Sequence, residues 1–170
     1  MRMSMSFYSV FIKLVLITSL IVSPITFAQG KPKEIYWEDL IPTGHVQVES
    51  TAQANHEGTE QNWIQPNLDA PIVPALDGQL VSLPGFVVPL EGDDENITEF
   101  LLVPFFGACI HVPPPPPNQI VHVIIKDGVP IDSLYDAIVV TGTLSTKGWS
   151  GEIAQVGYTM SGIGVAPFEL

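Results

Sequence analysis

Apolar and polar positions divide the chain into an apolar start, a polar middle and a second half rich in predicted strands. From residue 76 onward, short apolar or alternating stretches are separated by turn residues, which is the pattern of β-strands joined by turns. The pattern predicts five strands, over residues 80–90, 97–106, 119–126, 137–146 and 152–167. A short helical turn over residues 130–136 is predicted between the third and fourth strands, with Asp132 or Ser133 placed to cap it.

The predicted elements follow the order strand, strand, strand, short helix, strand, strand. This is the order of the five-stranded Greek-key barrel called the OB-fold. We therefore predict an all-β fold with small α content, in which an OB-like barrel over residues 76–170 follows an N-terminal extension over residues 29–75. An immunoglobulin-like sandwich is the alternative, but it requires about seven strands. Alternation in the last two strands places these residues on shared sides: Ile138, Val140 and Leu144, and then Ala154, Val156, Tyr158 and Met160.

The predicted strand over residues 97–106 carries apolar residues on both of its faces. Such a strand is either buried on both faces or presents an apolar patch to a partner. We expect the N-terminal extension, with Tyr36, Trp37 and Trp63, to cover the outer face, and a docking surface is the alternative. The apolar residues are Phe100, Leu102 and Phe106 on one face and Leu101, Val103 and Phe105 on the other.

The apolar start has the features of a secretory signal. Arg2 and Lys13 precede an apolar run over residues 14–25, and small or polar residues follow it up to Ala28. The run is shorter than the roughly 20 residues that span a bilayer. We therefore predict a signal peptide over residues 1–28, cleaved after Ala28, and a mature chain without a transmembrane span; an uncleaved anchor is the alternative. Because no cysteine lies near the cut, we predict a periplasmic protein that is not a lipoprotein.

The charge of the chain limits the class of partner. The sequence holds 6 Lys and Arg residues against 18 Asp and Glu residues, a formal net charge of −12. Removal of the predicted signal takes away Arg2 and Lys13 and makes the charge more negative. Such a surface repels phosphate backbones and attracts cations or basic proteins, so we expect no nucleic-acid partner.

The stretch from Gly107 to Gln119 is the one in which we expect chemistry. Its Cys109 is the only cysteine, and a lone thiol cannot form an internal disulfide. If the preceding strand continues, Cys109 and His111 share a face, and His122 approaches them from the next strand. Thiolate and imidazole groups together bind zinc or copper ions. The predicted metal site is therefore Cys109, His111 and His122, with Zn²⁺ as the expected ion; alternatively, Cys109 is a small buried hydrophobe and the histidines satisfy local hydrogen bonds.

A proline run follows the candidate metal ligands. Consecutive prolines form a stiff polyproline II rod of roughly 3.1 Å per residue. Such a rod can hold Cys109 and His111 in place, and it can also dock a partner protein. The predicted partner-binding residues are Pro113, Pro114, Pro115, Pro116, Pro117, Asn118 and Gln119.

Several stretches of the chain resemble a family of small exported bacterial proteins of unknown function. They are residues 76–90, residues 99–104, the Cys-x-His-x-proline-run-Asn-Gln motif over residues 107–119, and the upstream residues 37–42. The resemblance supplies no enzyme activity. Some members are similar to proteins encoded beside export-type ABC transporter components in zinc-starvation-regulated gene clusters, which implies, by association, a role in metal homeostasis or as a transporter accessory. Several members look like lipoproteins, and this chain departs from them.

Taken together, these interpretations predict a non-catalytic periplasmic accessory protein that binds a transition metal through Cys109 and His111. Its expected partner is an envelope ABC transporter component or another periplasmic protein. The alternative is an interaction module, in which the proline segment and the apolar strand face dock a partner and Cys109 is structural. A thiol enzyme that uses Cys109 with His111 is the third interpretation, but the sequence offers no evident group to orient the histidine.

Overall fold

The computed structural model describes residues 30–46, 64–109, 112–130 and 134–169. The chain divides into two units, Met1–Gly30 and Lys31–Leu170, and all of the described strands belong to the second. The predicted signal peptide, Trp63, His111 and the predicted caps Asp132 and Ser133 lie outside the described residues. No helix in the described part of the chain is long and apolar enough to cross a membrane.

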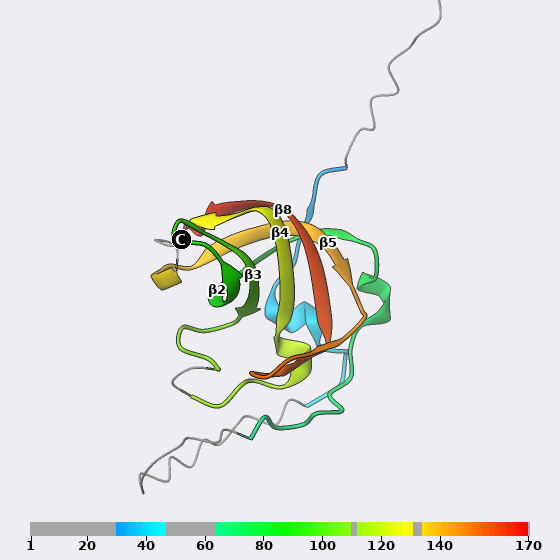
Figure 1. Ribbon diagram of the computed structural model, residues 1–170. Helices are drawn as coiled ribbons and strands as arrows, with labels where there is room; N and C mark the ends of the chain where they lie inside the picture. Colours follow the sequence, from blue (N-terminus) through cyan, green and yellow to red (C-terminus); the bar gives the residue numbers. More distant parts are fainter. Residues whose placement is uncertain (1–29, 47–63, 110–111, 131–133, 170) are drawn as a thin grey trace, which may run out of the picture. The chain divides into compact units, whose positions relative to one another are not determined.

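Five strands close into a barrel (Figure 1). They are β2 (Leu80–Gly92), β3 (Asn96–Val103), β4 (Val121–Pro130), β5 (Ile138–Ser145) and β8 (Tyr158–Pro167). Neighbours follow the order β2-β3-β4-β8-β5, and the pairing of β5 with β2 closes the ring. The pairing of β4 with β8 is parallel, and the other pairings of the ring are antiparallel. The predicted all-β, OB-like Greek-key barrel is confirmed.

Strand β2 contributes to the ring twice. Its residues 80–85 pair with β5 and its residues 86–92 pair with β3, so the strand bends at Gly85. A Cβ at Gly85 would lie 2.8 Å from the carbonyl oxygen of Val103 and 2.9 Å from the side chain of Leu102. Glycine is therefore required at position 85, where the backbone of β2 closely approaches β3. The short strand β1 (Lys33–Glu34) pairs in parallel with the first part of β2.

Several strand boundaries differ from the prediction, three of them by more than a shift of one or two residues. Strand β3 ends at Val103 rather than at residue 106, because Pro104 has no N–H for the ladder. Strand β4 continues through the predicted turn at residues 127–128, where Gly128 takes a φ of 72°. The predicted last strand is divided into β7 (Gln155–Val156) and β8, and residues 149–150, predicted as a loop, form β6 (Trp149–Ser150), which pairs with β7.

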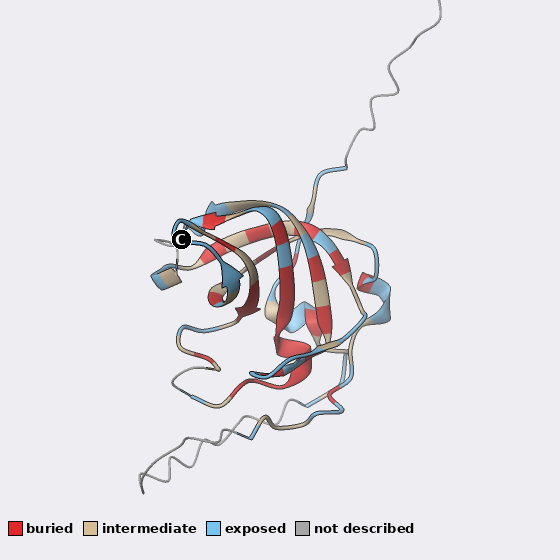
Figure 2. Ribbon diagram, viewed as in Figure 1, coloured by how far each residue is buried: buried red, intermediate tan, exposed pale blue. Residues whose placement is uncertain are grey.

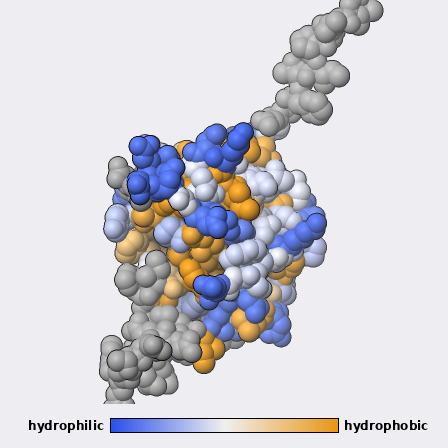
Figure 3. All heavy atoms as spheres, in the orientation of Figure 1, coloured by the Kyte–Doolittle hydropathy of each residue, from blue (hydrophilic) through white to orange (hydrophobic). Residues whose placement is uncertain are grey.

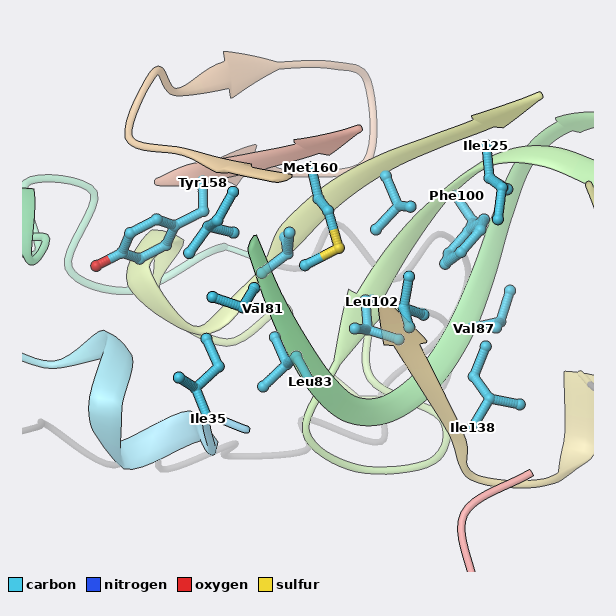
Figure 4. Packing of buried hydrophobic residues seen from close by; sticks show 14 of the residues in the cluster. Ile35, Val81, Leu83, Val87, Phe100, Leu102, Ile125, Ile138, Tyr158 and Met160 are labelled. Atoms are coloured by element: carbon cyan, nitrogen blue, oxygen red, sulfur yellow. The ribbon is translucent and has the colours of Figure 1, made fainter. Parts of the chain in front are cut away.

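The interior of the barrel is filled by one hydrophobic cluster, here called the inner cluster. Side chains from the strands and from the N-terminal extension converge on it (Figure 4). The extension contributes Ile35 and Leu40, both fully buried, so it forms part of the same core as the barrel. Other members include Val81, Leu83, Phe100, Leu102, Val121, Val123, Val140, Leu144, Tyr158 and Met160.

A second cluster, the outer cluster, lies on the opposite face of β3. Its buried members are Val88, Leu101, Val103, Ala108, Ile120, Ala154 and Val156. Strand β3 is therefore buried on both faces, as its apolar pattern indicated (Figure 2). For Tyr36 and Trp37 the predicted cover was wrong, because this face is covered by Trp149 of β6, Val156 of β7 and Ala154 between them. Trp37 of the extension instead packs against the inner cluster and donates its Nε1–H to the Pro84 carbonyl, 2.8 Å away.

One buried hydroxyl ties two parts of the N-terminal extension to β8. The Tyr158 hydroxyl accepts a hydrogen bond from the backbone N–H of Val73 at 2.7 Å and donates one to the carbonyl of Leu40 at 2.8 Å. Tyr158 is fully buried, and burial raises the pKa of its phenol. Leu40 and Val73, 33 positions apart in the sequence, therefore meet at the same point of the barrel.

Candidate functional site

The candidate segment begins in a tight turn after β3. Gly107 takes a φ of 81° and Cys109 a φ of 66°, a left-handed conformation that is uncommon for a residue with a side chain. Ala108 forms an isolated bridge with Val112 across this turn. Cys109 thus lies in a turn and not in an extended strand. The expectation that Cys109 and His111 share a strand face is wrong at Cys109, and His111 lies outside the described residues.

Burial controls the chemistry of the Cys109 thiol. The side chain packs against the outer cluster, and burial raises the pKa of the thiol to about 12. The thiolate is the nucleophilic and metal-binding form of cysteine. At neutral pH Cys109 therefore keeps its proton, and a metal would have to displace that proton in order to bind.

His122, the third predicted metal ligand, is held by two neighbouring elements. It lies buried on β4, and its Nε2–H donates to Oε1 of Glu99 on β3 at 2.7 Å. Its ring stacks on Trp149 of β6, with ring centroids 4.3 Å apart and an interplanar angle of 6°. His122 therefore joins β4 to β3 and to the β6–β7 pair. Among the described residues, no group of three or more His, Cys, Asp or Glu could hold a metal ion.

Sequence reasoning missed both partners of His122. Glu99 carried a usable signal, because it lies two positions before Leu101 and so shares its face of the strand. Leu101 pairs directly with His122, which brings Glu99 within reach along the same face. Trp149 carried no such signal, because it lies in a stretch between glycines that has no strand alternation.

The proline run, predicted to bind a partner, is buried against other segments of its own chain. Pro113 is partly buried, and the residues from Pro114 to Gln119 are buried. The side chain of Gln65, in the extension, donates from Nε2 to the carbonyls of Pro115 at 2.9 Å and Gln155 at 2.7 Å. The backbone N–H of Gln155 donates back to Oε1 of Gln65 at 2.8 Å. Gln65 therefore links the extension, the proline run and β7.

The two polar residues that end the motif make the same kind of contact. The side-chain amide of Asn118 donates to the carbonyl of Pro71, and that of Gln119 donates to the carbonyl of Trp37, each at 2.9 Å. Both acceptors lie in the N-terminal extension. Within the described residues, the segment predicted to bind a partner therefore binds the extension of its own chain.

Aromatic side chains are exposed on the other side of the Cys109 turn. Phe105 is 43% exposed and Phe106 is 54% exposed. The ring of Phe106 meets Phe86 of β2 edge-on at 6.1 Å and lies 6.3 Å from the ring of Tyr135, which is 76% exposed. Phe86 packs against the outer cluster. Phe86, Phe106 and Tyr135 thus form an aromatic row that leads from the packed face of β2 to solvent.

Two carboxylates with lowered pKa values lie outside this region and stabilise turns. The backbone N–H of Thr146 and the hydroxyls of Ser145 and Thr146 hold the pKa of Asp77 below its usual value. The backbone N–H groups of Asn96 and Glu95 do the same for Asp93 in the turn between β2 and β3. Asp93 accepts hydrogen bonds within its own turn, and Asp77 accepts them from Ser145 and Thr146 at the end of β5, so both lowered pKa values have a structural cause.

Comparison with known proteins identifies relatives over most of the chain. The family described as protein of unknown function (DUF3299) matches residues 37–167. The crystal structure of a DUF3299 family protein from Pseudomonas aeruginosa PAO1 is similar, with 44% sequence identity and a TM-score of 0.70. The similarity covers 83% of this chain and 99% of that one. No curated protein matches the chain.

Proposed function

The chain belongs to the DUF3299 family, described as proteins of unknown function, and we propose that it is a non-catalytic docking module of the bacterial envelope. The proposal rests on the side chains exposed on the barrel. The observation that carries the proposal is the aromatic row, in which Phe106 is 54% exposed although it contacts both Phe86 and Tyr135. Aromatic side chains are enriched in protein interfaces and dominate their binding energy.

The rest of the barrel favours docking at this row. OB-folds commonly bind ligands on the outer face of their second and third strands, which correspond to β3 and β4 here. In this chain the β6–β7 pair covers that face, and Trp149 stacks on His122 of β4. The formal charge of −12 also disfavours nucleic acid at any face. A thiol enzyme is disfavoured because the pKa of Cys109 is raised to about 12.

The proposal places this docking in the periplasm. A positively charged start followed by a short apolar run supports export with cleavage after Ala28. We further propose that the partner belongs to an envelope transport system, such as an ABC transporter component. Fractionation of cells that produce the full chain checks the compartment. A mature chain that remains in the cytoplasm or in the membrane fraction would contradict this part of the proposal.

Site-specific photo-crosslinking in cells tests the docking surface. The photoreactive residue p-benzoylphenylalanine replaces Phe106 in one variant and Ile163, on β8, in the other. The two positions are matched in exposure, at 54% and 55%. We expect a protein adduct from position 106 and little from position 163. Equal yields at the two positions, or no adduct at position 106, would reject the docking module.

A second candidate function is zinc binding at Cys109 and His111. The observation that favours it is the turn, because Cys109 is only partly buried there and is followed two residues later by His111. His122 would complete the site through its Nδ1, because its Nε2 is hydrogen-bonded to Glu99. Such a site would make the protein an accessory in zinc homeostasis, with Zn²⁺ bound rather than used in catalysis.

Metal analysis of the mature chain, residues 29–170, tests this second function. We expect near-stoichiometric zinc that is lost in Cys109→Ala and in His111→Ala. His122→Ala separates a two-residue site, which would keep its zinc, from a site that includes His122. A zinc-free wild-type chain, with Cys109 unreactive until the protein is denatured, would reject metal binding.

A further inference from the structure

The aromatic row is assembled from three separate parts of the chain. Phe86 comes from β2, Phe106 from the segment after β3, and Tyr135 from the segment before β5. The ring of Phe106 lies between the other two, at 6.1 Å from Phe86 and 6.3 Å from Tyr135. Because each ring already has a neighbour, a partner that binds here orders few side chains. The row is therefore a prearranged anchor.

The charge of the molecule determines which occupant suits this row. A second copy of the chain would bring the same formal charge of −12, and an anionic bilayer would repel it in the same way. The row itself offers an apolar contact, and the face in Figure 3 carries hydrophobic and hydrophilic residues side by side. A protein surface with an apolar side chain at its centre and lysines or arginines at its edge satisfies both conditions.

The sequence around the row is acidic. Asp136 directly follows Tyr135 and is exposed, and the strand that carries Phe86 leads into four exposed acidic residues. Residues 79–109 and 134–137 contain no lysine or arginine. The acidic residues after Phe86 are Glu91, Asp93, Asp94 and Glu95.

We propose that Phe106, flanked by Phe86 and Tyr135, is the anchor of a docking site for a basic protein surface, with Asp136 as an edge carboxylate. The proposal rests on the docking function above and adds the chemistry of the partner. A few central anchor residues, often aromatic, typically carry most of the binding energy of an interface. Reversal of an edge charge changes the association rate and the salt dependence instead.

Mapping of the adduct from position 106 tests the chemistry of the partner. We expect mass spectrometry to place the adduct in a segment of another protein that is rich in lysine or arginine, with a yield that falls as salt is added. An adduct with a second copy of the chain, with lipid or with an acidic segment would overturn the basic partner and leave the docking function intact. The absence of any adduct would overturn both proposals.

Charge reversal provides a matched control. Asp136→Lys is compared with Asp69→Lys, which makes the same change at an exposed position in the extension. Both variants carry the photoreactive residue at position 106. We expect Asp136→Lys to lower the adduct yield by roughly threefold or more at low salt, and Asp69→Lys to leave it nearly unchanged. Equal effects of the two reversals would overturn the role of Asp136 and the proposed basic surface.

Discussion

Two apolar stretches flank the Cys109 turn, and they differ in burial. Phe105 and Phe106, before the turn, stand 43% and 54% exposed, whereas Pro114 to Pro117, after it, are buried. By hydrophobicity alone the phenylalanines belong inside and the stiff prolines suit a surface. The order is reversed because the carbonyls of the proline run have partners in their own chain. Gln65 bonds to Pro115, and the backbone N–H of Gly157 bonds to the carbonyl of Pro117 at 2.6 Å.

The proline run has no N–H donors of its own. Such a rod becomes an interior element when other segments supply donors to its carbonyls. Those donors come from the N-terminal extension and from the β7–β8 region, both distant in sequence. The side chains of Phe105 and Phe106 contain no polar group that needs a hydrogen-bond partner. They can therefore remain partly exposed at a moderate cost in free energy. Function is accordingly expected at the exposed aromatic side of the turn and structure at the proline side.

The same substitution made on each side of the turn is expected to produce the largest difference in unfolding free energy. Pro116→Asp places a carboxylate in a buried position, and we expect it to lower the free energy of unfolding by about 3–5 kcal/mol. Phe106→Asp places the same group at a half-exposed position, where we expect a loss of about 1 kcal/mol or less. Chemical denaturation of both variants measures the difference. Similar losses would mean that the proline run is not interior.

Removal of one buried hydroxyl tests how firmly the extension is tied to the barrel. Tyr158→Phe leaves the carbonyl of Leu40 and the N–H of Val73 without this partner, and we expect a loss of about 1–3 kcal/mol in unfolding free energy. Tyr135→Phe, at an exposed position, is the control and should stay within about 0.5 kcal/mol of wild type. If the two variants were equally stable, the hydroxyl of Tyr158 would not join the extension to the barrel.

Substitution of Gln65 probes the link between the extension and the proline run. Gln65→Ala removes the hydrogen bonds to Pro115 and Gln155, and we expect a loss of about 1–2 kcal/mol, measured by thermal and chemical denaturation. Gln65→Glu keeps an acceptor for the Gln155 N–H but removes both donated bonds. It should therefore be destabilised nearly as much as Gln65→Ala, whereas wild-type stability in Gln65→Glu would show that the donated bonds contribute little.

Substitution of Cys109 is expected to have the smallest effect on stability, and an effect that is specific to alkaline pH. Its pKa rises from 9.0 in the unfolded chain to about 12 on folding, so the folded protein holds this proton more tightly. Stability is therefore fully present below pH 9.0, and it decreases as the pH rises from there towards 12. We expect Cys109→Ala to flatten this decrease in denaturation curves measured at several pH values. A remaining alkaline decrease is expected from Tyr158, whose pKa is also raised by burial.

Thiol labelling at neutral pH gives an independent measure of the same property. Cys109 should react with a disulfide reagent at least roughly tenfold more slowly in the native protein than in denaturant, because little thiolate is present. Equal rates in the two states would indicate an accessible thiolate and would favour the metal site and the thiol enzyme.

The candidate site could be predicted only in part, and the reason lies in how its contacts are made. Cys109 and the proline run were identified because their residue types are unusual, and this holds whatever the fold. The surroundings of His122 were not predicted, because Glu99 is 23 positions away and Trp149 belongs to a glycine-rich stretch predicted as a loop. The partner-binding assignment of Pro113–Pro117 could not anticipate that the chain's own extension contacts the run.

The sequence by itself determined the barrel, because alternation, turn residues and strand order are local properties that together favour one topology. It also determined the double burial of β3, since apolar residues on both faces require two covers, and the acidic surface that limits the partners. Only the tertiary structure decided which segment provides each cover and which apolar stretch remains outside. Those outcomes depend on contacts such as Tyr158 with Leu40, 118 positions apart, and Gln65 with Gln155, 90 positions apart. No local pattern of residues encodes contacts of that range.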